Sequence, residues 1–272
     1  MNIFKRLYKF ILPYTVKYAA LHKVSLFVYK TIVFVLKPFS RSSSVYNTMT
    51  SLDRHLGFAR VLGPGNVAIQ IGIVPKLYSH LFHIARTVGK NGTVIGIEAN
   101  PQSIEKLKEI AADIKFDCEF IFVNKACYSE KAKAKLFLSR GSGSWSRLEL
   151  VPGAASVQEQ GAILVDVDKI DNILAEIGIA PERISFVNVT INGAEYETLK
   201  GMTGLLERSE NISITVIAGR QGGDLGEIDH KPDYVVISDY LADFGLTVKF
   251  KRFSRGGFGY VMGTKGNAKF FI

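Results

Sequence analysis

Several side chains that could do chemistry stand where apolar, strand-like runs end. Glu98 closes the run from Thr93 to Glu98, about 28 residues after Gln70, which lies in the run Asn66 to Ile71. A carboxylate at the end of a buried strand can accept hydrogen bonds from both hydroxyls of a ribose. A solvated acid at a strand end is the simpler alternative. The segment around Glu98, taken as a whole, nevertheless favours a nucleotide site.

Histidines and cysteines add little further chemistry. His80 and His83 lie three residues apart in an expected helix, so they would share a face and could serve as general bases. A metal site would need a third ligand, and the sequence indicates none. The two cysteines, Cys118 and Cys127, form no C-x-x-C pair and cannot build a disulfide framework. We therefore predict no metal and a reduced, cytoplasmic setting.

The elements that position these residues alternate between strand and helix. Apolar, strand-like runs cover residues 66–71, 93–98, 118–123, 134–138, 162–167, 184–189, 212–217, 246–251 and 259–262. Helical runs cover residues 48–62, 76–88, 101–113, 195–202 and 234–244. This alternation predicts an α/β fold with a mostly parallel twisted sheet, helices on both faces and an antiparallel edge. Ligands bind such sheets beyond the carboxyl ends of the strands, here after residues 71, 98, 123 and 189.

The formal net charge of +9 is concentrated at the N-terminus. Residues 1–41 contain no Asp or Glu and eight of the 34 basic residues, namely Lys5, Arg6, Lys9, Lys17, Lys23, Lys30, Lys37 and Arg41. The other 26 basic residues face all 25 acidic residues, so the body of the chain is nearly neutral. The sequence therefore predicts no nucleic-acid partner.

The basic N-terminal residues are also apolar. The most apolar stretch, residues 24–36, is interrupted by Lys30 and is shorter than the roughly 20 residues of a spanning helix. No small-residue cleavage site follows it, as a signal peptide would require. We expect residues 1–37 to make a peripheral contact with an anionic membrane. Packing on the domain or on a second copy in a homo-oligomer, and a true membrane span, are the alternatives.

The contrast between the basic, apolar N-terminus and the nearly neutral body also indicates the domain organisation. The stretch KPFSRSSSVYN at residues 37–47 has the Pro and Ser content of a linker. We therefore predict a basic, apolar helical extension with its linker over residues 1–47, and one α/β domain over residues 48–272.

Four segments, in order, resemble the FkbM-type S-adenosylmethionine-dependent methyltransferases. They are NVAIQIGIVPKLYSHLF (66–82), GTVIGIEANPQSIEKLKE (92–109), VNKACYSEKAKAKLFL (123–138) and ISFVNVTINGAEYETLKGM (184–202). The last segment is similar to the family's hallmark D-F-I-K-I-D-V-E-G-A-E-x-x-x-L-x-G. The resemblance covers about 150 residues. It implies a Rossmann-like methyltransferase fold, S-adenosylmethionine as cofactor and a hydroxyl-bearing glycan or similar small-molecule acceptor.

The resemblance also implies roles for individual residues. The cofactor-binding positions are Gln70, Gly72, Glu98, Asn124 and Ala126. The positions nearest the reacting groups are Glu195, Thr190 and Asn192. The segment SRGSGSWSR (139–147), with the chain's one Trp, Trp145, could cover the site or simply connect two strands.

The chain departs from the family pattern at functional positions. Gln70 stands where the family has Asp, and Asn188, Thr190 and Asn192 replace Lys, Asp and Glu. Lys76 replaces a glycine, and a Lys forced to positive φ would cost about 1–2 kcal/mol. Pro75 also removes a backbone N–H. These changes predict weakened cofactor binding and leave a second hypothesis open. The chain would then be a catalytically inactive methyltransferase-like domain that binds a membrane or partner.

Overall fold

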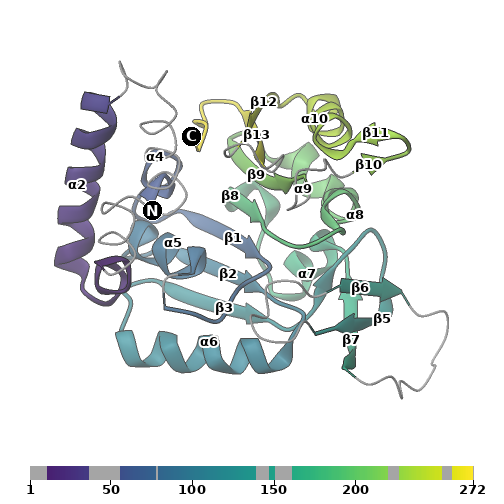
Figure 1. The fold of residues 1–272 in the computed structure, drawn as a ribbon, viewed down its shortest axis with the longest axis horizontal. Coiled ribbons are helices and arrows are strands. Elements are labelled where there is room, and N and C mark those ends of the chain that lie inside the picture. The colour runs from purple at the N-terminus through teal and green to yellow at the C-terminus, as the bar shows by residue number, and fades with distance from the viewer. Residues whose placement is uncertain are drawn as a thin grey trace.

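The central sheet has seven strands in the order β12-β13-β9-β8-β1-β2-β3 (Figure 1). The computed structural model describes residues 11–36, 56–77, 79–138, 147–150, 161–219, 227–252 and 259–271. Five strands run parallel: β1 (Val67–Ile71), β2 (Thr93–Ile97), β3 (Glu119–Val123), β8 (Ile184–Val189) and β9 (Ile212–Ala218). At one edge, β13 (Gly259–Lys265) pairs antiparallel with β9 and with β12 (Thr247–Arg252). The predicted fold class is confirmed.

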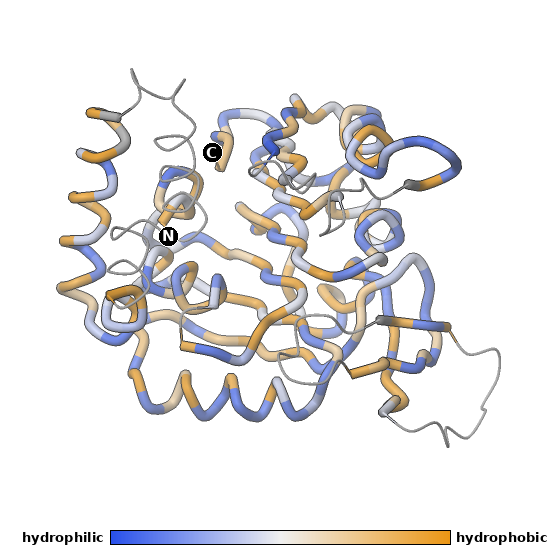
Figure 2. The backbone as a smooth tube through the Cα atoms, in the orientation of Figure 1, coloured by the Kyte–Doolittle hydropathy of each residue, from blue (hydrophilic) through white to orange (hydrophobic). Residues whose placement is uncertain are grey.

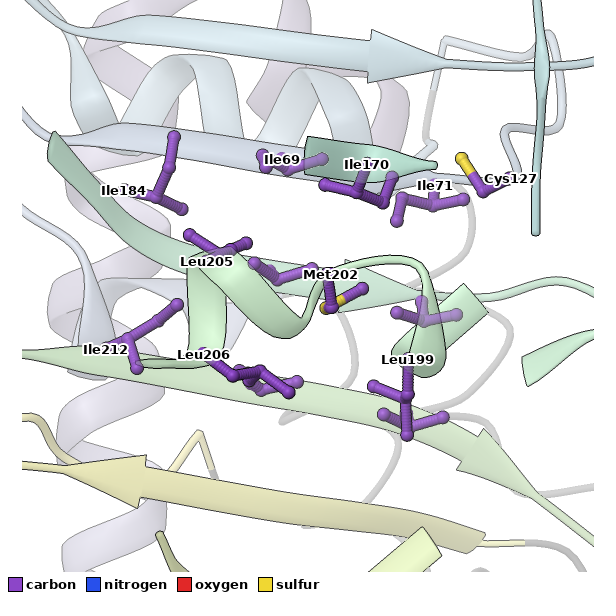
Figure 3. Packing of buried hydrophobic residues seen from close by; sticks show 14 of the residues in the cluster. Ile69, Ile71, Cys127, Ile170, Ile184, Leu199, Met202, Leu205, Leu206 and Ile212 are labelled. Carbon is purple, nitrogen blue, oxygen red and sulfur yellow. The ribbon is translucent and has the colours of Figure 1, made fainter. Parts of the chain in front are cut away.

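Helices cover both faces of this sheet because the parallel strands are apolar on both sides. β1 is buried throughout, and its successive side chains point to opposite faces. Ala68 packs in a cluster with α5 (His80–Val88) and, through Leu107, α6 (Pro101–Ile114). Ile69 packs in the opposite cluster, where Figure 3 shows Met202, Leu205 and Leu206 over the strands. That layer comprises α7 (Ile170–Glu176), α8 (Glu195–Lys200), α9 (Thr203–Arg208) and α10 (Asp233–Asp243).

A second, four-stranded sheet follows β3 and lies beyond the carboxyl ends of β1, β2 and β3 (Figure 1). Its strands are β4 (Ala126–Cys127), β5 (Ala132–Phe137), β6 (Arg147–Leu150) and β7 (Ala162–Asp168), in the order β4-β7-β5-β6. The short strands β10 (Glu227–Ile228) and β11 (Lys231–Pro232) form a hairpin, and η2 (Pro181–Arg183) is a 3-10 turn.

Two predicted helices have different bounds in the structure. The helix expected over residues 76–88 begins at His80, because the chain first turns, with the Lys76 N–H donating to the Val74 carbonyl at 2.8 Å. The helix expected over residues 195–202 ends at Lys200. A Cβ at Gly201 would lie 2.0 Å from the Tyr128 carbonyl oxygen, so the close approach at Gly201 separates α8 from α9. Of the helix expected over residues 48–62, the structure describes α4 (Phe58–Val61).

The described part of the N-terminal extension is helical at residues 11–17 and in α2 (Ala19–Leu36). Val16 is fully buried with residues of the α5 face. The Arg86 guanidinium donates to the carbonyls of Val16, at 2.7 Å, and Lys17, at 3.0 Å. One face of the extension therefore packs on the domain. No described helix combines the length and apolar character that a membrane span requires. The predicted linker and domain boundary at residue 47 lie outside the described residues.

Candidate functional site

The order of the central sheet reverses between β1 and β8. From β1 the chain proceeds to β2 and β3 on one side, while β8 and β9 lie on the other. Backbone bonds draw the strand ends together: the Thr190 N–H donates to the Ile71 carbonyl at 2.9 Å, and the Gly72 N–H donates to the Ile97 carbonyl at 3.0 Å. The carboxyl ends beside such a reversal are where ligands bind in open α/β sheets. The predicted site residues after residues 71, 98 and 189 therefore share one edge.

The Glu98 carboxylate is held at this edge by two backbone donors. Its Oε2 accepts from the Ile73 N–H at 2.7 Å, and its Oε1 accepts from the Asn100 N–H at 2.9 Å. Burial raises the pKa of the Glu98 carboxyl, and the backbone N–H bonds oppose that shift. A carboxylate offers about four acceptor positions, so those that the backbone N–H groups leave can accept from a ribose hydroxyl. Glu98 therefore fits the nucleoside half of the cofactor that the sequence predicts.

Asn124 and Ala126 follow β3 and have different surroundings. The Asn124 side-chain amide donates to the backbone carbonyls of Glu98 and Ala99, both at 2.9 Å. It therefore positions the loop that carries Glu98. Ala126 is buried in β4, opposite Val167, and packs in the core of the second sheet.

Gln70, Asn188 and Thr215 form a row of buried polar side chains across three strands. They are register partners on β1, β8 and β9. The Asn188 amide donates to Gln70 Oε1 at 2.6 Å, and the Thr215 hydroxyl donates to Asn188 Oδ1 at 2.6 Å. The substitutions at positions 70 and 188 are therefore neighbours in space, and each supplies the other with a hydrogen-bond partner.

Thr190 and Gly72 extend this row into the two loops. Thr190 Oγ1 accepts from Gln70 Nε2 at 2.7 Å and donates to the Gly72 carbonyl at 2.9 Å. Gly72 has φ of +74°, and a Cβ there would lie 2.5 Å from the Thr190 carbonyl oxygen. The loop after β1 thus needs glycine at position 72 in order to lie against the loop after β8.

The strain expected at Lys76 is absent. The described non-glycine residues with positive φ are Asn91, Lys115, Asp229 and His230. Lys76 is exposed, and its carbonyl accepts from the Ser79 N–H at 2.9 Å. The loop avoids the left-handed conformation by turning at residues 74–76, so the cost that a positive φ would bring does not arise at Lys76.

Glu195 begins α8 and is the candidate base at this edge. Burial raises the pKa of its carboxyl to about 7, although bonds from the Glu195 and Gly193 N–H groups favour the charged form. The Asp233 carboxylate also raises this pKa by repulsion. A general base works best with a pKa near the working pH. Asn192, the third predicted residue, is exposed in the turn before α8.

Asp233 was not among the predicted site residues. It is the first residue of α10, and its carboxylate accepts from the Gly219 N–H at 2.7 Å and the Tyr234 N–H at 2.6 Å. Gly219 directly follows β9, so Asp233 ties α10 to the same edge of the sheet as Glu195. An acid immediately before an amphipathic helical run is the sequence signal that could have identified it.

The two predicted histidine bases lie apart. His80 Nδ1 is 3.3 Å from the Asn188 amide nitrogen, so His80 reaches the polar row. His83 is fully buried and faces His22 of α2, with 6.4 Å between ring centroids. Within the described ranges, no three His, Cys, Asp or Glu residues gather as a metal site would require. Trp145 lies outside the described residues.

A family profile described as the methyltransferase FkbM domain matches residues 67–244, which include every strand end described above. The chain belongs to this methyltransferase family. No curated protein matches the chain.

Several solved structures have a detectable likeness to this chain. A putative rRNA methylase from Clostridium thermocellum is 12% identical, with a TM-score of 0.47, over 79% of this chain and 94% of that one. Aeropyrum pernix fibrillarin with bound S-adenosyl-L-methionine is 11% identical, with a TM-score of 0.41, over 74% of this chain and 67% of that one. A SAM-dependent methyltransferase from Aquifex aeolicus is 14% identical, with a TM-score of 0.39, over 78% of this chain and 95% of that one. The family assignment depends on the profile match and not on these likenesses.

Proposed function

We propose that this member of the FkbM family is an S-adenosylmethionine-dependent O-methyltransferase whose acceptor is a hydroxyl of a glycan or similar metabolite. The observation that carries the proposal is the Glu98 carboxylate, fixed by two backbone N–H groups at the end of β2. A carboxylate at the end of this strand suits the hydroxyls of a ribose.

Each part of the site has a role in this proposal. When bound, the cofactor supplies a methyl group on a sulfonium, and transfer breaks the carbon–sulfur bond and forms a carbon–oxygen bond. Glu98 holds the ribose, and Asn124 keeps the Glu98 loop in place through two carbonyls. Thr190 and Asn192, on the loop after β8, orient the acceptor, because positioning supplies much of the rate of a direct displacement.

Glu195 receives the proton that the acceptor hydroxyl loses. Its pKa of about 7 leaves a substantial fraction ionised at neutral pH, and this fraction can accept a proton. Asp233 assists by repelling the charged form of Glu195 and so keeping its pKa near the working pH.

The second candidate function is a catalytically inactive domain that binds a partner. It is favoured by the Gln70 side chain, whose amide is committed to Thr190 at 2.7 Å and to the Gly72 carbonyl at 3.0 Å. An amide occupied within the chain is less available to the amino-acid half of a cofactor. Together with Pro75, which has no N–H, this predicts weaker cofactor binding than an Asp at position 70 would give.

Titration calorimetry with S-adenosylmethionine and with its demethylated product distinguishes the two candidates. We expect measurable binding to the wild-type chain and about tenfold or greater weakening in Glu98→Gln, which removes a charged acceptor. Glu105→Gln, on the exposed side of α6, is the matched control and should bind as wild type. No binding at millimolar ligand would reject the enzyme and favour the inactive domain.

We also propose that the protein works in the cytoplasm at the periphery of a membrane. The support is the basic N-terminal segment without acidic residues and the two cysteines, both free thiols in the structure. Co-sedimentation of the full chain with anionic vesicles tests this location.

A further inference from the structure

The outer face of α2 is an apolar surface that the domain leaves uncovered. Among described residues, nine of the ten exposed large hydrophobic side chains lie between positions 11 and 35. Phe27 and Phe34 are 73% and 81% exposed. Figure 2 shows apolar segments along the whole of α2, at the edge of the molecule. Apolar patches of this kind mark interaction surfaces in soluble proteins.

The inner face of the same helix is fixed to the domain. His22 and Tyr29 are seven residues apart, so they lie on one side of the helix, and both are buried. The Arg60 guanidinium carbon lies 5.4 Å from the Tyr29 ring centroid. Burial lowers the pKa of His22 to about 4, so the inner face is neutral at physiological pH. The domain therefore holds the outer face in a constant orientation.

Basic side chains flank the outer aromatic residues. Lys23 and Lys30 are exposed, and each precedes one of the exposed phenylalanines, Phe27 and Phe34, by four residues. Residues four apart are neighbours on a helix surface, so each lysine shares one side of α2 with a phenylalanine. A headgroup layer of anionic lipid suits this arrangement, because rings enter the acyl boundary while ammonium groups meet phosphates. A second copy of the chain fits less well, since residues 1–41 contain no acidic group to pair with a lysine.

We propose that the outer face of α2 docks on an anionic bilayer, with the helix lying in the plane of the surface. The inference rests on the membrane location proposed above and is independent of methyl transfer. In Figure 1, α2 lies on the side of the molecule opposite the carboxyl ends of β1, β2 and β3. A protein docked through α2 therefore presents the Glu98 edge to the aqueous side. This orientation selects a water-soluble acceptor over a lipid-embedded one.

Co-sedimentation of the full chain with phosphatidylcholine vesicles, with and without phosphatidylglycerol, tests the docking face. We expect the wild type to bind the anionic vesicles. Phe27→Ser with Phe34→Ser should weaken that binding about tenfold or more, because two rings no longer enter the bilayer. Lys23→Gln with Lys30→Gln should weaken it about tenfold on anionic vesicles only. The control Leu164→Ser, at an exposed apolar residue of β7, should bind as wild type.

Three results would overturn the proposal, and they differ from one another. In the first, a triple variant with Lys5→Gln, Arg6→Gln and Lys9→Gln loses vesicle binding, while the variant with Phe27→Ser and Phe34→Ser binds as wild type. This result would retain the membrane location but reject α2 as the docking surface. Dissociation of a dimer by the phenylalanine variant, without any effect on vesicles, would make the face a contact between copies. No sedimentation of any variant, wild type included, would reject both the face and the membrane location. An unchanged Tm of the phenylalanine variant, expected because both rings are exposed, excludes misfolding as the cause of lost binding.

Discussion

Gln70 and Asn188 show how a charge difference from the family pattern is compensated inside the chain. The family has Asp at the first position and Lys at the second, and the two positions are register partners on β1 and β8. Here two neutral amides meet at 2.6 Å, fully buried. A buried charge is costly without its partner, so a change at one position requires a change at the other.

Restoring the family charges one at a time should therefore destabilise the protein. Gln70→Asp and Asn188→Lys should each lower the free energy of unfolding by about 3 kcal/mol, because each buries an unpaired charge. The double variant should lose less than the sum, with a coupling of about 1–3 kcal/mol. Urea unfolding at pH 7 measures all three. Strictly additive losses would show that the two side chains do not compensate each other.

Glu195 should give the reaction and the stability a pH dependence. Its folded pKa of about 7 lies above the ordinary value of 4.5, so the folded state binds more protons between these pH values. Stability should therefore fall as pH rises from about 4.5 to 7, and Glu195→Gln should remove that fall. The turnover rate should rise with pH around 7 in the wild type and lose this step in Glu195→Gln. A pH–rate profile identical in both proteins would contradict its role as the base.

At the scale of elements, Arg86 joins the N-terminal helices to the domain. Its guanidinium caps the helix of residues 11–17 through the carbonyls of Val16 and Lys17 and lies over the Phe116 ring, with 4.4 Å from guanidinium carbon to centroid. The last carbonyls of a helix lack partners within it, so a cation there satisfies them.

Arg86→Ala should lower the free energy of unfolding by about 2 kcal/mol, since two charge-assisted hydrogen bonds are lost. Hydrogen exchange over residues 11–36 should speed up more than exchange in the central strands. Arg208→Ala is the matched control, because Arg208 forms an exposed, solvent-screened ion pair with Glu182 whose loss should change stability little. Equal losses in the two variants would mean that Arg86 does not anchor the extension.

The sequence predicts the strands of the central sheet well and the helix ends poorly. Val, Ile and Phe runs such as those of β1 and β8 have few alternatives to a buried strand, so their bounds agree closely with the structure. The late start of α5 depends on a local turn at residues 74–76, and the end of α8 at Lys200 depends on a contact distant in sequence, Gly201 against Tyr128. Short elements such as β4 and α9 carry too little periodicity to predict.

In the candidate site, too, some residues could be predicted from the sequence and others could not. Glu98, Gly72 and Thr190 could be predicted because each occupies a motif position at a strand end. Their partners could not, since the bond between Gln70 and Asn188 joins residues 118 apart. His83 shares a helix with His80, yet the fold turns it toward α2 and away from the strand ends. Helical spacing alone does not determine which side of a helix meets the site.

At the scale of the whole molecule, the proposed docking face and the proposed site lie on opposite sides. The basic, apolar face of α2 lies on one side, and the carboxyl ends of β1, β2 and β3 lie on the other (Figure 1). Glu98 is the residue on which the proposed chemistry depends, since its carboxylate is built into the loop after β2 by two backbone bonds.

The most direct test is a crystal structure of the full chain with S-adenosylhomocysteine. We expect both ribose hydroxyls within about 2.5–3.0 Å of the Glu98 carboxylate oxygens, as O–H to O⁻ hydrogen bonds require. A ribose bound elsewhere, with Glu98 contacting only the Ile73 and Asn100 N–H groups, would contradict it.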